Sequence, residues 1–266
     1  MNLEALKNTL FENIDYTDNI FTKHFHNTYT IGITNGGMFK SINQNKTYLS
    51  YKNSTRVINP QEVHGGISTN WNYTNFYPSV ELVSDIYEQI FFEKKIPIFQ
   101  KHLIDDIYLY KMLYELFINV YYEKDSMKIE IKLIEVLSYL IKNYTGSVRN
   151  YDDSFDNKRV IRDTVDYIQD TKALNLSLDE LANNVNPSKY HFLRVFKNNL
   201  GITPHNYIVA YKIQRAKDLI LNGDSLSDVS LEVGFSDQSH FIKNFKKIYG
   251  YTPKKLVDNS NIILYK

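Results

Sequence analysis

The sequence predicts an α+β protein of several domains: a β-rich N-terminal part, a helical hairpin and an all-α C-terminal part. Over the first hundred residues, short β-branched and aromatic runs are separated by Asn, Gly and Pro. Two long segments, 102–122 and 126–144, then carry apolar residues at helical spacing. Further on, one helical pattern occurs twice, as HFLRVFKNNLGITP from residue 191 and HFIKNFKKIYGYTP from residue 240.

The composition is that of a globular protein. The chain has 266 residues, of which 43% are hydrophobic and 23% charged, and this length suffices for two ordinary domains. No apolar run approaches the roughly 18 residues of a membrane helix, and the polar N-terminal residues do not resemble a signal peptide. The absence of cysteine excludes disulfides and thiolate metal sites. We therefore expect a cytoplasmic protein without membrane contact.

Residues 1–100 are expected to form a β-sandwich or barrel. The runs TYTIGITNGG, KTYLSY, TRVINP and NWNYTNFYP are short, closely spaced and bounded by turn residues. Many short strands at such spacing are typical of these two architectures.

Residues 101–144 are expected to form an antiparallel helical hairpin, because only the short polar stretch EKD separates the two periodic segments. Its first helix carries a long stripe with several tyrosines, whose hydroxyls suit a partly wet interface. We interpret the hairpin as a dimerisation element; the alternative is that it only covers the open side of the barrel. The stripe on the first helix consists of Leu103, Ile107, Tyr110, Tyr114, Phe117 and Tyr121.

Segment 145–157 is polar and aperiodic, and we take it as a linker.

Positive charge is concentrated in the last third of the chain. Residues 158–266 hold 16 Lys/Arg and 11 Asp/Glu, whereas the other 157 residues hold 15 and 19. A basic segment attached to a mildly acidic body favours a polyanion as the partner of that segment.

Each copy of the repeat begins with a helix start signal. Ser177 is followed three residues later by Glu180, and Ser225 is followed by Asp228, which is the capping-box arrangement. A turn comes next, and a second helix would bury two phenylalanines four residues apart while presenting a basic, amide-rich face. Two helices joined by a tight turn describe a helix-turn-helix, whose second helix enters the major groove of DNA.

The alternative is two ordinary helical hairpins with solvated outer faces. Repetition of the caps, the core phenylalanines and the basic positions in both copies favours DNA recognition. Between the copies, Thr203 and Pro204 begin a helix that Asn222 and Gly223 end. This linker helix of about 18 residues is about 27 Å long. It could hold two recognition helices about one DNA turn, ~34 Å, apart.

Residues 158–258 resemble the DNA-binding region of the AraC/XylS family of bacterial transcription regulators. The strongest resemblance is carried by EVGFSDQSHFIKNFKKIYGYTP in the second copy. Members are mostly activators that bind promoter DNA and contact RNA polymerase, and many have an N-terminal effector-binding and dimerisation domain. The resemblance implies base-reading roles for Tyr190, Leu193 and Arg194 in the first copy, and for Gln238, Ser239, His240 and Lys243 in the second.

The chemistry of these side chains refines the expectation. Arg194 can bind a guanine edge bidentately and Gln238 an adenine edge, each providing about 1–3 kcal/mol of discrimination. Leu193 departs from a polar pattern, since it offers only apolar contact, for example with a thymine methyl. We expect the remaining basic residues of the two helices to contact DNA as well, chiefly its phosphates. They are Lys189, Lys197, Lys246 and Lys247.

The histidines of the N-terminal part suggest a second kind of site. His24 and His26 are spaced to lie on one face of a strand, and His64, preceded by Glu62, is a possible third ligand of a metal. In cupin enzymes a glutamate follows the His-x-His pair, and here it is missing. This half resembles the cupin-like sensor domain of AraC-type regulators, so we expect an effector pocket and neither a metal nor another cofactor. Purely structural histidines are the alternative. Expected pocket residues are His24, His26, Tyr29, Glu62, His64 and Trp71.

Residues 1–100 are thus predicted to form a cupin-like effector domain, 101–144 a dimerisation hairpin, and 158–266 a DNA-binding domain with two helix-turn-helix motifs. The predicted function is a sequence-specific transcription regulator, an activator without enzymatic activity, that responds to a small effector and forms a homodimer. Two alternatives remain: a metal-dependent cupin enzyme fused to a DNA-binding domain, or an effector-independent regulator whose barrel binds another protein.

Overall fold

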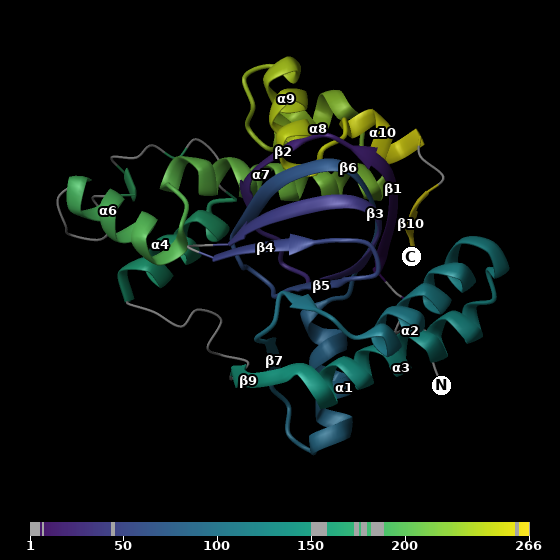
Figure 1. Cartoon of the computed structure of the whole chain (residues 1–266). Helices are drawn as coiled ribbons and strands as arrows, with labels where there is room; N and C mark the ends of the chain where they lie inside the picture. The colour runs from purple at the N-terminus through teal and green to yellow at the C-terminus, as the bar shows by residue number, and fades with distance from the viewer. Residues whose placement is uncertain are drawn as a thin grey trace.

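The N-terminal part is built on one strongly curved sheet (Figure 1). The computed structural model describes residues 6, 8–43, 46–149, 159–172, 176, 180–181, 189–258 and 261–265. The sheet has eight strands in the order β10-β1-β6-β3-β5-β8, with β2 paired to β6 and β4 paired to β3. Its strands are β1 (Leu10–Thr17), β2 (Ile20–His24), β3 (Thr30–Asn43), β4 (Lys46–Ser50), β5 (Thr55–Ile58), β6 (His64–Tyr77), β8 (Leu103–Ile104) and β10 (Ile262–Leu264).

The expected α+β fold class is confirmed, with one correction to the barrel. Strands β8 and β10 end the pairing order, and no pairing joins them in the described part of the chain, so the curved sheet is open. Both end strands are short: β8 has two residues and β10 has three.

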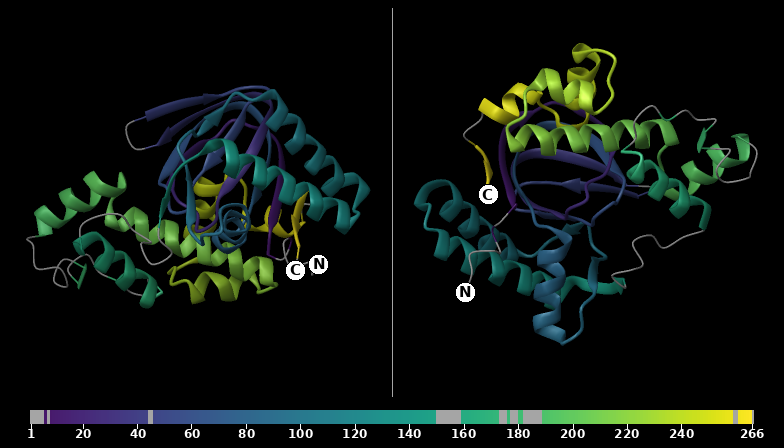
Figure 2. Two further views of the ribbon diagram at one scale, coloured as in Figure 1. Left: turned by 90° about the horizontal axis from the view of Figure 1, so that it is seen from below. Right: turned by 180° about the vertical axis from the view of Figure 1, so that it is seen from behind.

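The two faces of the sheet are covered by different helices. Side chains alternate between the faces along a strand. On β6, Trp71 and Tyr73 belong to a core shared with the C-terminal helices, whereas Phe76 packs against Phe117 of the hairpin. Figure 2 shows the hairpin and the C-terminal helices on different sides of the sheet.

Three helices cover the outer face: α1 (Val80–Phe91), α2 (Ile107–Ile118) and α3 (Ser126–Tyr144). Ser79, Asp106 and Asp125 cap their N-termini through side-chain oxygens. Asp106 also accepts hydrogen bonds from Tyr139 and Tyr144, which fixes the start of α2 against α3. A π-helix, Asn119–Glu123, ends the first arm of the hairpin.

Two details of the expected hairpin and linker are corrected. The first helix begins at Ile107, not at residue 102, because Leu103 and Ile104 pair with β5. The expected stripe does not form one surface, since Phe117 is buried while Ile107 and Tyr114 are exposed. Residues 145–149, expected as linker, form strand β9 (Thr145–Arg149), which pairs with β7 (Ile96–Phe99). The rest of the expected linker, 150–157, lies outside the described residues.

The C-terminal part is helical, with one exception. Its helices are α4 (Arg159–Asp170), α6 (Lys189–Leu200), α7 (Pro204–Asn222), α8 (Leu226–Glu232), α9 (Gln238–Tyr249) and α10 (Pro253–Asp258). The exception is β10, near the end of the chain, which crosses to the N-terminal sheet and pairs with β1. Of the first helix of the first repeat only residues 180–181 are described, and its expected cap Ser177 lies outside them. Among the described residues, no helix is both long and apolar enough to cross a lipid bilayer.

Candidate DNA-binding surface and interdomain site

The second helix-turn-helix consists of α8 and α9. Ser225 caps α8 by accepting a hydrogen bond from the Asp228 backbone, as the capping box predicts. Gly234 in the turn has a φ of 75°, in the left-handed region that favours glycine. Asp237 caps α9 by accepting from the His240 backbone at 2.7 Å. The two caps and the turn glycine define where each helix begins and where α8 ends.

Helix α9 has a buried face and an exposed basic face. Phe241 and Phe245 are fully buried, as expected from their i, i+4 spacing. All the residues predicted to contact DNA on this helix are exposed, so α9 presents one continuous polar surface. They are Gln238, Ser239, His240, Lys243, Lys246 and Lys247.

Helix α6 repeats this arrangement. Phe192 and Phe196 are fully buried, while Arg194 and Lys197 are exposed and Leu193 is half-buried. Lys189 and Tyr190 form the first turn of α6, and their side chains lie outside the description. The linker helix α7 begins with the Thr203 cap and Pro204 and ends at Gly223, as predicted. Figure 2 shows α6 and α9 toward opposite ends of α7.

Strand β2 and the residue before it, Asn19, contact both helix-turn-helix motifs. Gly201 and Gly250 occupy equivalent positions, at the C-terminal ends of α6 and α9. Lys23 donates from Nζ to the Gly201 carbonyl at 2.8 Å, and Asn19 donates from Nδ2 to the Gly250 carbonyl at 3.3 Å. Thr22 donates to the Lys247 carbonyl, also at 3.3 Å. One segment of the sheet therefore positions the ends of both recognition helices.

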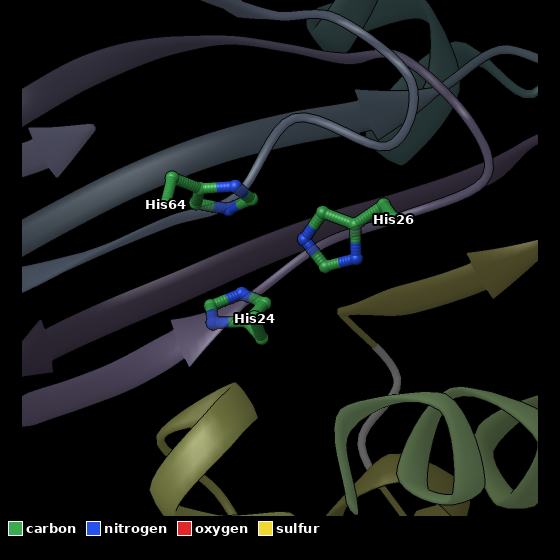
Figure 3. A group of neighbouring side chains, drawn as sticks. All are labelled: His24, His26 and His64. Atoms are coloured by element: carbon green, nitrogen blue, oxygen red, sulfur yellow. The ribbon is translucent and has the colours of Figure 1, made fainter. Parts of the chain in front are cut away.

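The three predicted histidines come together on the concave face (Figure 3). His24 ends β2, His64 begins β6, and strand pairing places them opposite each other. His26 lies on the loop that follows β2. The ring centroids are 4.4 Å apart for His24 and His64, 5.0 Å for His24 and His26, and 5.1 Å for His26 and His64. Burial lowers the pKa of His24 to about 4 and holds the pKa values of His26 and His64 well below the ordinary value.

The other three expected pocket residues, Trp71, Glu62 and Tyr29, lie in three different places. Trp71 lines the same concave face as the histidines and stacks between Phe39 and Tyr73. The Glu62 carboxylate does not belong to the cluster of His24, His26 and His64, and it binds His102 at 2.8 Å. Tyr29 does not line the interdomain cavity or the hollow beside the histidines: it is fully buried in the core beneath the hairpin, where its hydroxyl donates to the Pro97 carbonyl at 2.7 Å. The sheet alternation places Tyr29 on the opposite face from Trp71.

A buried ion pair joins the two parts of the chain. Lys217 on α7 lies 2.7 Å from the Glu12 carboxylate on β1, and both side chains are buried. Tyr77 and Tyr251 donate their hydroxyls to the same carboxylate, at 2.7 and 2.6 Å. Burial alone would raise the pKa of Glu12, but the Lys217 charge and these hydrogen bonds together hold it below the ordinary value.

A cavity of about 340 Å³ lies beside this ion pair, between the sheet and the helices. Its sheet side includes His26 and Tyr77, and its helical side includes Lys217 of α7 and Tyr249 of α9. Tyr249 stacks on His26 at 6.1 Å, so the end of the recognition helix forms part of the cavity wall. The remaining lining residues are Asn8, Leu10, Thr28, Gln214, Asp218, Leu221, Asn222 and Leu264.

Sequence reasoning missed Glu12, Lys217 and Tyr249. Lys217 had a signal, because it interrupts the buried stripe of α7 formed by residues such as Ile213 and Ile220. A lysine at an apolar position of a helix suggests a buried partner. The partner itself had no signal, because Glu12 is 205 residues away in the chain.

Comparisons with known proteins match both parts. Residues 181–259 match a family model described as a helix-turn-helix domain, and residues 11–137 match one described as an AraC-like ligand binding domain. An uncharacterised HTH-type transcriptional regulator of Bacillus subtilis, YbfI, is 29% identical over 227 residues, covering 83% of this chain and 81% of the relative. The lactose operon transcription activator of Staphylococcus xylosus is 33% identical over 88 residues, 33% of this chain and 32% of that protein.

Solved structures of ToxT from Vibrio cholerae share the fold. One has a TM-score of 0.61 at 15% identity and covers 94% of this chain and 96% of its own. Another, solved with an unsaturated fatty acid bound, has a TM-score of 0.60 at 16% identity and covers 94% of each chain. At such identity the similarity establishes the architecture alone.

Proposed function

Because the chain belongs to the AraC/XylS family of DNA-binding transcription regulators and carries an N-terminal ligand-binding domain, we propose that it activates transcription in response to a small effector. The effector occupies the interdomain cavity, and α6 and α9 bind the promoter. The observation that carries this proposal is the bonding of one sheet segment to both motifs: Lys23 to Gly201, and Asn19 to Gly250. A change in the sheet at this segment alters the placement of both recognition helices together.

In this proposal α6 and α9 read two successive major-groove segments. Arg194 binds a guanine edge and Gln238 an adenine edge, while Leu193 supplies apolar contact. Tyr190, Ser239, His240 and Lys243 complete the base-reading surfaces. Phosphates are bound by the other basic residues of the two helices, and this binding weakens with salt. Those residues are Lys189, Lys197, Lys246 and Lys247.

The effector site is the interdomain cavity. Its volume of about 340 Å³ is at the lower end of the range of small-molecule pockets, roughly 300–1,000 Å³. Its walls come from both parts of the chain, so an occupant that fits one arrangement better favours that arrangement. A shift from 1:99 to 99:1 requires about 5.5 kcal/mol of differential binding. Lys217 lines the wall, where its charge is paired with Glu12, and a solved structure of ToxT contains a fatty acid, so small carboxylic acids are the first class to screen.

Two further partners belong to this proposal. A second copy of the chain binds through the α2–α3 hairpin, where Tyr108, Tyr114 and Ile131 expose large apolar surfaces. RNA polymerase is the partner at the promoter, and the cytoplasm is the site of action.

The proposal is tested by selecting binding sites from random duplex DNA with the full-length protein at moderate salt. The expected product is one site with two short boxes about ten base pairs apart. A titration of small carboxylic acids then follows, with Leu221→Trp as the variant that fills the cavity and leaves α6 and α9 unchanged. This variant should bind DNA and lose the response. Failure of wild-type protein and of residues 159–265 to enrich any site overturns the DNA-reading role.

A further inference from the structure

We propose that His24, His26 and His64 bind one divalent transition-metal ion on the concave face of the sheet, directly beneath the end of helix α9. Zn²⁺ is the first candidate, because imidazole nitrogens suit zinc as well as copper, iron and nickel. One nitrogen from each ring lies within 4.8 Å of the others.

Hydrogen bonds fix two of the rings in the form that a metal requires. His24 donates from Nδ1 to the Thr22 carbonyl at 2.7 Å, and His64 donates from Nδ1 to the Glu62 carbonyl at 2.8 Å. A backbone carbonyl can only accept, so each Nδ1 carries the proton and each Nε2 keeps its lone pair. Histidines that bind metals in proteins are oriented by this kind of bond from the other ring nitrogen.

The surroundings favour an ion over an organic ligand. The hollow that the three rings line, together with Arg56 and Trp71, has a volume of only about 40 Å³. An ion with bound water fits a hollow of this size, whereas pockets for small organic molecules measure roughly 300–1,000 Å³. All three histidines are buried, so an ion bound by them would be shielded from bulk solvent.

Metal binding would require a small movement of His26. Nitrogens at about 2.0–2.1 Å from a tetrahedral zinc are roughly 3.3 Å apart, closer than the 4.8 Å limit observed. His24 and His64 are held by strand pairing and backbone hydrogen bonds, whereas His26 lies on a loop. His26 therefore approaches the other two rings.

This movement connects the metal to α9. His26 stacks on Tyr249 and lines both the histidine hollow and the interdomain cavity. Drawing the ring toward a metal weakens its contact with the end of the recognition helix. This second step rests on the proposed function; the metal site itself does not.

The test uses full-length protein without an affinity tag, stripped with a chelator and dialysed. Binding of Zn²⁺ is measured by calorimetry and elemental analysis, and Co²⁺ supplies an absorption spectrum that reports coordination. The variants are His24→Gln, His26→Gln and His64→Gln. The control is His205→Gln, an exposed histidine on α7. Melting curves verify that each variant folds.

We expect one ion per chain for the wild type and the control, and at least a 100-fold loss of affinity in each cluster variant that folds. Co²⁺ should give the spectrum of a four-coordinate site with nitrogen ligands. Absence of stoichiometric binding to the wild type, or equal binding by the cluster variants, overturns the site. If the variants unfold, the wild-type Co²⁺ spectrum decides: a six-coordinate, water-like spectrum also overturns it.

Binding of the selected DNA site, with and without Zn²⁺, then tests the coupling. A Zn²⁺ effect that His26→Gln abolishes and His205→Gln retains supports it. Unchanged DNA affinity at saturating Zn²⁺ overturns the coupling and leaves the metal site established. Loss of DNA binding under every condition contradicts the proposed function instead, because metal binding is measured without DNA.

Discussion

Lys217 and Glu12 form a buried ion pair of 2.7 Å that fastens the linker helix α7 to strand β1. Two tyrosine hydroxyls complete the coordination of the carboxylate, one from the sheet and one from the segment after α9. The pair therefore links three parts of the molecule: the sheet, the linker helix and the second helix-turn-helix. Two such charges are costly to bury, and removal of either partner leaves the other without compensation.

Replacement of Glu12 should destabilise the protein in a pH-dependent way. At pH 7 we expect Glu12→Gln to lower the free energy of unfolding by about 3–5 kcal/mol, because Lys217 remains buried without a counter-charge. The pKa of Glu12 is lower in the folded state than its ordinary value of 4.5. Its contribution is thus present above pH 4.5 and is lost as the pH falls through the folded-state value. Melting curves from pH 7 downward should show wild type and variant converging.

The control for this prediction is Glu232→Gln. Glu232 forms an ion pair with Arg215 at 3.5 Å but is half exposed. An exposed pair contributes about 0–1 kcal/mol. A similar loss in both variants at pH 7 would show that the Glu12–Lys217 pair has no special role.

A methyl group at Gly250 should disturb the docking of α9. Gly250 has a φ of 81°, and an added Cβ would lie 2.8 Å from the Phe21 ring of β2. We expect Gly250→Ala to cost about 1–2 kcal/mol for the left-handed backbone and about 1–3 kcal/mol more for overpacking. Urea unfolding of the full-length protein measures the sum.

Gly223→Ala isolates the backbone effect. Gly223 also has a positive φ, of 108°, but an added Cβ would meet nothing within 4 Å. Gly223→Ala should therefore show only the backbone cost of about 1–2 kcal/mol and no overpacking cost. Equal losses for the two variants would mean that Phe21 accommodates the methyl group and that the β2–α9 contact is loose.

The C-terminal motif could be predicted from sequence because its determinants are local. The caps at Ser225 and Asp237, the turn glycine Gly234 and the buried pair Phe241 and Phe245 lie within about twenty residues of one another. Each follows from the chemistry of a helix end or from helical periodicity.

The interdomain site could be predicted only in part. The histidines were recognisable as residue types, but strand pairing across forty residues brings His64 to His24. Sheet register also explains why Tyr29 lies on the face opposite to the histidines, since a one-residue step moves a side chain to the other face. Tyr249 reads in the sequence as an ordinary core residue of α9, and only its docking against β2 makes it part of the cavity wall.

The hairpin should mediate self-association. We expect Tyr114→Lys combined with Ile131→Lys to convert a dimer into a monomer, because both side chains are about half exposed on the hairpin and a charge there opposes burial. Sedimentation of the full-length protein measures the state. Leu231→Lys, at an exposed position on α8, is the matched control and should leave the dimer intact. A wild type that is monomeric at all concentrations contradicts the dimer.

Replacing a base-reading residue and replacing a phosphate-binding residue should change DNA affinity in different ways. The first loss should depend on the DNA sequence, and the second should depend on the salt concentration. Arg194→Ala should cost about 1–3 kcal/mol on a site with an intact first box and relax the preference at one base pair. Lys247→Ala should weaken binding to all sequences similarly and reduce the slope of log affinity against log salt by about 1. Fluorescence anisotropy with the selected site, and with copies carrying single-box mutations, separates the two behaviours. Lys128→Ala, at an exposed position on α3, should change neither quantity. If Arg194→Ala lowers affinity equally for intact and mutated boxes, α6 holds the backbone without reading sequence, and the specificity lies in α9 alone.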